Sequence, residues 1–227
     1  MNVKSKIRVR LTFISPILGS CPSNPEIYRK YVASKSPDAD GIEEEVAQLG
    51  VDGVIDKTMT VFPRVAGKPV LLFRQLRGFF KAACKAARKC TDAKNGDWGY
   101  ESKAIKAYVQ VIDTLIFMTP REVPIMFNGE VRGFERPLRA STPQGERIAL
   151  ANSEEIPKGA TVEFEIQALT NQYESAIREW LDYGVFSGLL QFRNGGYGRF
   201  VWEEIDEMGN VIGGNKAEWD KINIATV

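Results

Sequence analysis

The stretch GLLQFRNGGYGRF, residues 188–200, is the most informative part of the chain because it gathers glycines and arginines in one short segment. Gly195, Gly196 and Gly198 lie between Arg193 and Arg199. Glycine adopts positive φ angles at little cost and lets another backbone approach closely, so such a loop can bind a phosphate chain or pack on a neighbouring strand. A simple turn before a strand has the same composition. The segment alone leaves both interpretations open.

Length and composition indicate an ordinary globular protein. The chain has 227 residues, 44% of them hydrophobic and 26% charged, which predicts one large domain, spanning 1–227, that carries insertions. No apolar run is long enough to cross a bilayer, and the first residues contain no signal-peptide core, so we expect a cytoplasmic protein without a membrane partner. The three cysteines form no CxxC pair, which predicts neither a disulfide framework nor a zinc site.

The chain contains no histidine, and this narrows the chemistry that it can perform. Histidine is the usual general base near neutral pH and a frequent ligand of transition metals. Catalysis would therefore depend on carboxylates, lysine, tyrosine or a bound divalent cation. The formal net charge is +1, so a nucleic-acid partner would require the 30 lysines and arginines to gather on one face.

Hydrophobic periodicity predicts alternating strands and helices. Ile7, Val9, Leu11 and Phe13 alternate with polar residues, as in a strand with one buried face. Similar patterns predict a helix at Phe73–Arg88, a strand at Thr161–Ala168, a helix from Asn171 to Gly184 with Glu174 in a capping box, and a strand at Arg199–Ile205. The period within Ala104–Phe117 is ambiguous, and a helix followed by a strand is predicted there. This order of strand, helix, strand, strand, helix, strand predicts an α+β, ferredoxin-like fold of the kind that RNA-recognition modules use.

Two further segments stand apart from this order. Residues 22–58 are polar, contain a predicted helix at Ile42–Leu49, and are interpreted as an insertion near the N-terminus. Ile125–Lys158 is predicted to form two extended strands around a turn at Ser141–Gly145. The part from about 128 to 150 has few apolar residues, so we expect it to project as an arm and to pack on something else.

Basic residues gather at two places besides the glycine-rich loop. Along the helix at Phe73–Arg88, cations recur every three or four residues with no acidic residue among them, which is typical of a nucleic-acid surface and also of a solvated helix face. The arm carries four arginines with Phe134 among them, and Phe134 or Tyr197 is a candidate for stacking on a base, although a packing role is the simpler interpretation for Tyr197. The candidate RNA-binding residues are Arg74, Arg77, Lys81, Arg132, Arg136, Arg139, Arg193, Gly195, Gly196, Gly198 and Arg199.

The expected sheet offers a third basic surface that we interpret differently. Arg8 and Arg10 lie on the polar face of the first strand. In a ferredoxin-like sheet the third strand lies beside the first, which places Glu163 and Glu165 near these arginines. Cross-strand ion pairs are therefore expected, and the RNA path is expected over the loops, the arm and the helix.

Four segments in order resemble the RAMP superfamily, the repeat-associated proteins that build CRISPR effector complexes, and most of all the compact backbone subunit of type III complexes. They are ISPILGS at 14–20, AGKPVLLFRQLRGFFKAA at 66–83, SEEIPKGATVEFEIQAL at 153–169 and RNGGYGRF at 193–200. The resemblance covers most of the chain apart from 22–58, 91–103 and the tail after about 206.

The resemblance implies a subunit that binds guide RNA, and target RNA through it, and that forms homo-oligomers along the RNA beside other RAMP-like subunits. The central hairpin would act as a thumb that inserts into the guide and target duplex. Type III backbone subunits cleave RNA with an aspartate after the first strand in a metal-dependent reaction. Asp38 and Asp40 are weak candidates for that role, because the sequence DADG is more typical of a plain turn.

We therefore expect no catalytic residue, no metal site and no cofactor, with Mg²⁺ required only if the chain is a nuclease. Two alternatives stay open. The first is a RAMP-fold interaction protein of a mobile element that docks onto such complexes or competes with them, which the near-neutral charge and the acidic segment 38–46 favour. The second is a divalent-metal-dependent endoribonuclease.

Overall fold

The structure is a computed structural model, and it describes residues 2–23, 59–87, 105–142 and 145–224. The predicted insertion lies outside these ranges apart from Pro22 and Ser23, and so do the helix expected at Ile42–Leu49 and the candidates Asp38 and Asp40. The described residues form a mixed α+β structure whose strands pair mostly antiparallel.

A five-stranded antiparallel sheet in the order β13-β12-β1-β11-β7 forms the centre of the structure. The chain supplies its strands as β1 (Ser5–Phe13), β7 (Ile116–Thr119), β11 (Thr161–Ala168), β12 (Phe200–Ile205) and β13 (Val211–Gly214). Strands β1, β11 and β12 confirm predictions, while β7 begins at the end of the segment 104–117, where a helix followed by a strand was predicted. In β1 and β11 the period-two alternation of the sequence matches a sheet with one buried face. Ile7, Val9, Leu11 and Phe13 are all buried.

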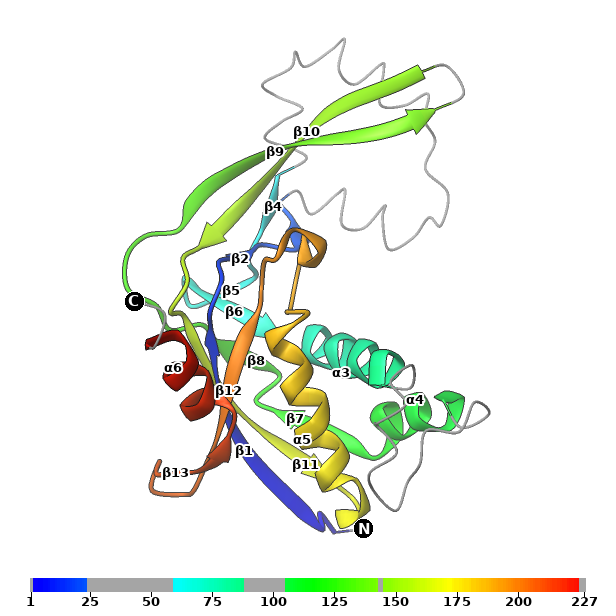
Figure 1. Ribbon diagram of the computed structural model, residues 1–227, viewed down its shortest axis with the longest axis vertical. Helices are drawn as coiled ribbons and strands as arrows, with labels where there is room; N and C mark the ends of the chain where they lie inside the picture. The colour runs from blue at the N-terminus through cyan, green and yellow to red at the C-terminus, as the bar shows by residue number, and fades with distance from the viewer. Residues whose placement is uncertain (1, 24–58, 88–104, 143–144, 225–227) are drawn as a thin grey trace.

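Two helices cover the buried face of this sheet (Figure 1). They are α3 (Phe73–Ala87) and α5 (Glu174–Asp182), and a third helix, α4 (Ile105–Thr114), packs beside α3. Aromatic side chains join the layers: the rings of Phe80 and Trp180 lie 6.2 Å apart, and those of Phe79 and Phe200 lie 5.0 Å apart. The apolar stripe of α3 thus faces the core, and its cations remain near the surface.

The predicted capping box at Glu174 is wrong. Thr170 caps a short 3₁₀ turn at Asn171–Tyr173, where its hydroxyl accepts a hydrogen bond from the Gln172 amide at 3.3 Å. Because that turn comes first, Glu174 begins the α-helix without a side-chain cap. Its carboxylate lies 3.5 Å from Nη1 of Arg178, one helical turn further on.

The two extended segments predicted within Ile125–Lys158 are strands β9 (Arg132–Thr142) and β10 (Gly145–Ile156), which form one long hairpin. Figure 1 shows this hairpin extending beyond the main sheet, away from α3 and α5. We call it the arm. At its base the arm forms a sheet with three short strands, β2 (Ile17–Leu18), β3 (Cys21–Pro22) and β4 (Thr60–Val61). A separate three-stranded sheet consists of β5 (Arg64–Val65), β6 (Lys68–Leu72) and β8 (Glu122–Pro124).

Glu154 fixes the base of the arm to the body. Its carboxylate accepts hydrogen bonds from the backbone of Phe62 at 2.8 Å and from Arg64 Nη2 at 2.6 Å. Its backbone oxygen accepts from the amide of Gly19 at 2.8 Å. Glu154 thus joins the arm to two other chain segments, one at Gly19 and one at Phe62 and Arg64, and these bonds orient the arm relative to the body.

The polar face of the main sheet carries the expected ion pairs. Nε of Arg10 lies 2.6 Å from Oε1 of Glu163, its direct neighbour across the β1–β11 ladder, which confirms the prediction for this pair. Arg8 lies opposite Glu165 in the register, and Nζ of Lys6 lies 3.9 Å from the same carboxylate. Carboxylates of the same sheet therefore offset part of the positive charge of this surface.

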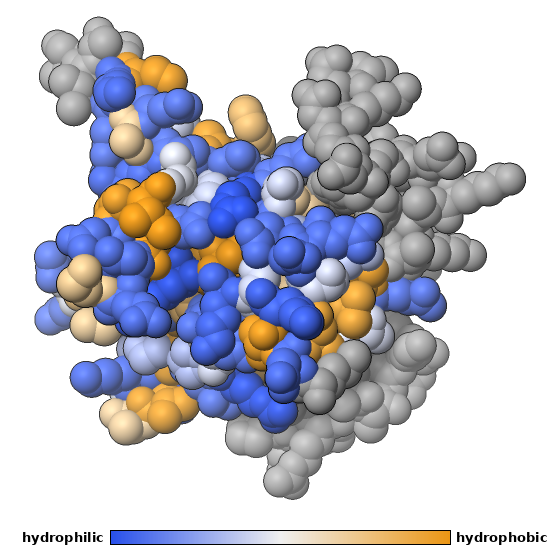
Figure 2. Space-filling view, turned by 90° about the horizontal axis from the view of Figure 1, so that it is seen from below, coloured by the Kyte–Doolittle hydropathy of each residue, from blue (hydrophilic) through white to orange (hydrophobic). Residues whose placement is uncertain are grey.

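The chain continues after β12 with β13 and helix α6 (Lys216–Ile224), which lies beside β12 in Figure 1. The turn between β12 and β13 is held by Asp206, whose carboxylate accepts from the backbone amides of Met208 and Asn210. The face seen in Figure 2 is mainly hydrophilic, with apolar groups in separate patches. None of the helices in the described ranges combines the length and the apolar character needed to cross a membrane.

Candidate nucleic-acid interface

The glycine-rich segment forms a loop, residues 188–199, that folds back on itself; we call it the glycine loop. The amide of Leu189 donates to Gly198 O and the amide of Gly198 donates to Pro16 O, both at 2.8 Å. The amide of Arg199 donates to the hydroxyl of Ser15 at 2.8 Å. Gly188 and Gly198 meet backbone to backbone, so a Cβ at either position would overlap the opposite strand of the loop. The segment that follows β1 thus anchors this loop.

Two residues other than glycine adopt left-handed backbone angles in the loop. Leu190 has φ 69° and Phe192 has φ 55°. Each costs on the order of 1–3 kcal/mol and persists only where surrounding contacts over-determine the backbone. Such strain concentrates at binding sites, and here it brackets Gln191.

The predicted loop glycines have structural roles. Gly196 needs its positive φ of 83°. Gly195 leaves room for the ring of Phe192, and Gly198 provides the close backbone contact. These observations explain the shape of the loop only. Direct contact of the three glycines with RNA stays a prediction.

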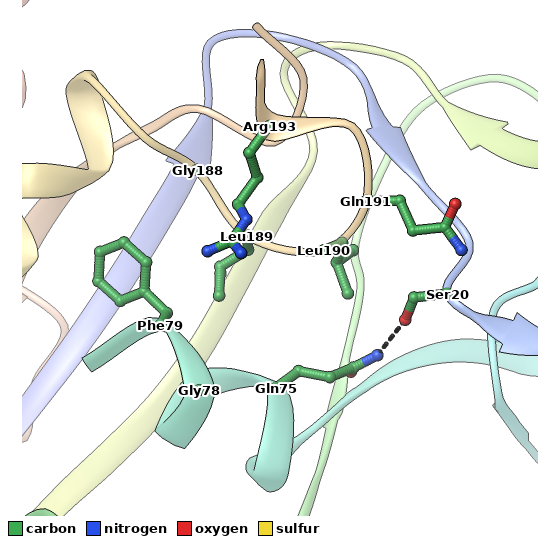
Figure 3. A pocket seen from close by; sticks show the side chains of 9 residues that line it. All are labelled: Ser20, Gln75, Gly78, Phe79, Gly188, Leu189, Leu190, Gln191 and Arg193. Atoms are coloured by element: carbon green, nitrogen blue, oxygen red, sulfur yellow. Dashed lines mark hydrogen bonds between the residues drawn. The ribbon is translucent and has the colours of Figure 1, made fainter. Parts of the chain in front are cut away.

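A cavity of about 240 Å³ lies between the glycine loop and the first half of α3 (Figure 3). Phe79, Leu189 and Leu190 supply its apolar walls, and Arg193 extends from the loop toward α3. On the other side, Gln75 Nε2 donates to Ser20 Oγ at 2.6 Å, while Gln75 Oε1 accepts from the amide of Leu72 at 2.7 Å. The cavity therefore combines an apolar interior with a polar rim.

The basic stripe of α3 divides into two parts. Arg74 is exposed, and its Nη2 lies 3.8 Å from Sγ of Cys21, next to Ser20 on the cavity rim. Arg77 and Lys81 instead turn toward α4, where Asp113 lies 3.8 Å and 2.7 Å from them. The guanidinium of Arg77 also lies 4.9 Å from the ring centroid of Phe73. The carboxylate of Asp113 offsets these two cations.

Aromatic and cationic side chains connect the arm to the glycine loop. Phe134 and Arg136 lie two residues apart on β9 and therefore share a face of the strand. The Phe134 ring lies 5.1 Å from that of Tyr197, which lies 5.3 Å from that of Phe192. The guanidinium of Arg136 lies 4.0 Å from the Phe192 centroid. We call these four residues the arm–loop stack.

The arm–loop stack supports a packing role for Tyr197, as its simpler interpretation predicted. Partial burial raises the pKa of its hydroxyl above the ordinary value, and Glu155 adds to the rise while Arg136 opposes it. Arg132 is exposed at the start of β9. For Arg139 the structure describes only the backbone, paired with Ile148.

Three arginines hold a buried donor that finds no acceptor among the described residues. They are the Nε groups of Arg77, Arg136 and Arg199. A buried donor without an acceptor costs roughly 1–3 kcal/mol, so each such group calls for a partner such as water or a ligand oxygen. Arg199 is the last residue of the glycine loop and Arg136 lies over its Phe192, so two of these donors belong to the loop or to a residue in contact with it.

The structure thus places Arg193 on the cavity, Arg74 beside Cys21 and Arg136 against the glycine loop. Arg77 and Lys81 instead lie near Asp113. The polar rim residues Ser20, Gln75 and Gln191 were not predicted, although Ser20 and Gln75 fall within the first two segments quoted for the resemblance. Within the described ranges, acidic residues and cysteines form no group of three or more that could hold a metal ion.

Comparisons with known proteins do not identify a family for this chain. No family model matches the sequence, and no curated protein matches it. A chain in the solved structure titled "Cryo-EM structure of the Type III-B Cmr-beta bound to cognate target RNA" aligns with a TM-score of 0.48 and 8% identity. The alignment covers 86% of this chain but only 57% of that one, so the chain spans little more than half of its length. Such a likeness is too low to assign a family or a function.

Proposed function

We propose that the chain is an RNA-binding structural subunit of a ribonucleoprotein effector complex of the CRISPR type, with a ferredoxin-like RAMP fold. The chain order β1, α3, β7, β11, α5, β12 together with the sheet order β12-β1-β11-β7 supports the fold. Its partners are guide RNA, target RNA and other RAMP-like subunits, and copies of the chain assemble along the RNA in the cytoplasm.

The observation that carries this proposal is the strained glycine loop, which presents Arg193 over the cavity between this loop and α3. Arg193 is exposed, and the loop that holds it is fixed by hydrogen bonds to Pro16 and Ser15. A guanidinium held on a preformed loop binds phosphate with little loss of conformational entropy. Arg74 on one side and Arg132 on the other extend the cationic path along the backbone of an RNA strand.

The alternative is a RAMP-fold interaction protein of a mobile element that docks onto such complexes or competes with them. The ion pairs favour it: Arg10, Arg77 and Lys81 are offset by carboxylates of the same chain, and the net charge is only +1. Such a protein would need less exposed cationic surface than a subunit that binds RNA along its length. Metal-dependent cleavage through Asp38 or Asp40 stays a third proposal.

The nucleic-acid content of the purified protein separates the first two functions. An RNA-binding subunit expressed with its guide should carry RNA of defined length after purification at low salt, with a high ratio of absorbance at 260 nm to that at 280 nm. Protein that is free of RNA under those conditions would support the interaction protein instead. Extracted RNA should be sized on a denaturing gel.

A further inference from the structure

The cavity beneath the glycine loop has an apolar lining. Phe79 and Leu189 close its floor and are only 3% and 1% exposed, while the partly exposed Leu190 packs against the core from the loop. Its volume of about 240 Å³ falls below the roughly 300–1,000 Å³ of pockets that hold drug-sized ligands, so it suits one small ring system. None of the residues that line it is acidic.

The rim supplies hydrogen-bonding groups at the edge of this apolar interior. The Gln75 amide is already committed to Leu72 and Ser20, which fixes its orientation and leaves it one N–H. Gln191 lies on the glycine loop with its amide on the side of Ser20, and it makes no hydrogen bond to the other lining residues in Figure 3. Amide side chains of this kind pair with the edges of nucleobases.

Gln191 lies in a strained part of the backbone that contacts on both sides hold in place. It lies between Leu190 and Phe192, the two non-glycine residues with left-handed angles in this loop. The hydrogen bond from Leu189 to Gly198 on one side and the contact of Arg136 with Phe192 on the other hold this conformation. The strained backbone therefore holds the residue whose amide makes no hydrogen bond to the other lining residues.

A phosphate fits the interior poorly, because Phe79, Leu189 and Leu190 cannot solvate an anion. It fits the rim, where the exposed Arg193 lies. An RNA nucleotide has both parts, an anionic phosphate and a flat ring with polar edges. Protein sites for single-stranded RNA commonly receive unstacked bases in this way.

We propose that this cavity takes one unpaired nucleobase of the RNA, with Phe79, Leu189 and Leu190 against its faces, Gln191 and Gln75 at its edge, and Arg193 on the neighbouring phosphate. This inference rests on the proposed function, and it specifies which part of the RNA the cavity binds, namely a base. Contact with the base is by shape and amide groups, so the site discriminates modestly among bases.

Gly78 allows a direct test. It lies on the rim in α3, is exposed, and has nothing within 4 Å of a Cβ built on it. Gly78→Phe therefore adds a ring at the rim of the cavity with no clash at its Cβ, and Gly78→Ala is the matched control. Gln191→Ala is a second variant in the exposed loop, for use if Gly78→Phe fails to fold in a thermal melt.

The probes are a labelled single-stranded RNA and a chain of equal length whose bases are replaced by abasic ribose units, titrated by fluorescence anisotropy at two salt concentrations. Wild type and Gly78→Ala should prefer the base-bearing RNA by about tenfold. Gly78→Phe and Gln191→Ala should lose most of that preference and keep the salt slope.

Equal binding of both chains by wild type, with a steep salt slope, would overturn this inference and leave the proposed function standing. So would a preference for bases that survives in both Gly78→Phe and Gln191→Ala. Binding of neither chain by wild type would overturn the proposed function itself.

Discussion

The guanidinium of Arg136 lies 4.0 Å from the ring centroid of Phe192, so a residue of the arm covers a residue of the glycine loop. Arg193, the proposed phosphate contact, follows Phe192 directly in the chain. The contact makes the base of the arm and the glycine loop one packed unit. A change in the angle of the arm would therefore shift Phe192, the residue that precedes Arg193.

Replacing Arg136 tests this contact. Arg136→Met keeps much of the side-chain length and removes the charge, and it should lower the free energy of unfolding by about 0.5–1 kcal/mol. Arg132→Met removes the same charge from an exposed position at the start of β9, so its stability should change by less. Denaturant unfolding of both variants measures the difference, and equal losses would contradict a specific role for the contact with Phe192.

The close approach of Gly188 and Gly198 predicts opposite outcomes for two glycine substitutions. Gly188→Ala should destabilise the protein by several kcal/mol or prevent folding, because its Cβ would overlap the carbonyl of Gly198. Gly78→Ala should raise the free energy of unfolding by up to about 1 kcal/mol, since alanine favours the helix and the site is open. If Gly188→Ala melted like the wild type, the described loop conformation would be wrong.

The arm tip should matter for assembly more than for folding. Leu138 pairs with Ala149 across the hairpin, so removing 139–148 and joining these two residues by a two-residue Gly-Ser turn keeps the arm–loop stack. The shortened protein should melt cooperatively at nearly the wild-type temperature and fail to form oligomers on RNA. Analytical ultracentrifugation with RNA of several lengths reports the oligomers, and unchanged assembly would argue against a role for the tip.

Two aspartates predict opposite pH dependences. Burial raises the pKa of Asp182, although Trp202 and Asn215 donate hydrogen bonds to it. Its folded pKa lies above its unfolded value, so the folded state binds more protons and gains stability as pH falls through that range. Asp182→Asn should therefore be more stable than wild type near neutral pH, and the difference should shrink as the medium becomes acidic.

Asp206 has the opposite sign. Hydrogen bonds from Asn210 lower its pKa, so its stabilising effect is present above the unfolded pKa and is lost as pH falls through the folded pKa. Asp206→Asn should be less stable than wild type near neutral pH, and this gap should close in acid. Denaturation of both variants between acid and neutral pH provides the measurement. Differences that do not vary with pH would contradict the assignment of these shifts.

The sequence predicted those parts of the fold that depend on local patterns. Strands β1 and β11 face a core on one side only, so alternate residues had to be apolar. The pair of Arg10 with Glu163 followed from strand order alone. The arm was predicted because its residues could not form a core of their own.

The composition of the site was harder to predict because it depends on contacts between distant segments. Asp113 draws Arg77 and Lys81 away from the exposed stripe, yet it lies in a segment whose periodicity was ambiguous. The left-handed angles of Leu190 and Phe192 could not be predicted from glycine positions, because contacts of the loop with the segment after β1 and with β9 hold this conformation. The cavity itself combines Ser20, which lies between β2 and β3, with residues of α3 and of the glycine loop.

The salt dependence of RNA affinity, measured for wild type, Arg193→Ala and Arg8→Ala, tests the central claim most directly. Arg8→Ala removes the same charge from the polar face of the main sheet, away from the cavity. We predict that Arg193→Ala weakens binding to all RNA sequences about equally and reduces the slope of log affinity against log salt by about 0.7, while Arg8→Ala changes neither. An unchanged affinity and slope in Arg193→Ala, or an equal loss in Arg8→Ala, would contradict RNA binding at the glycine loop.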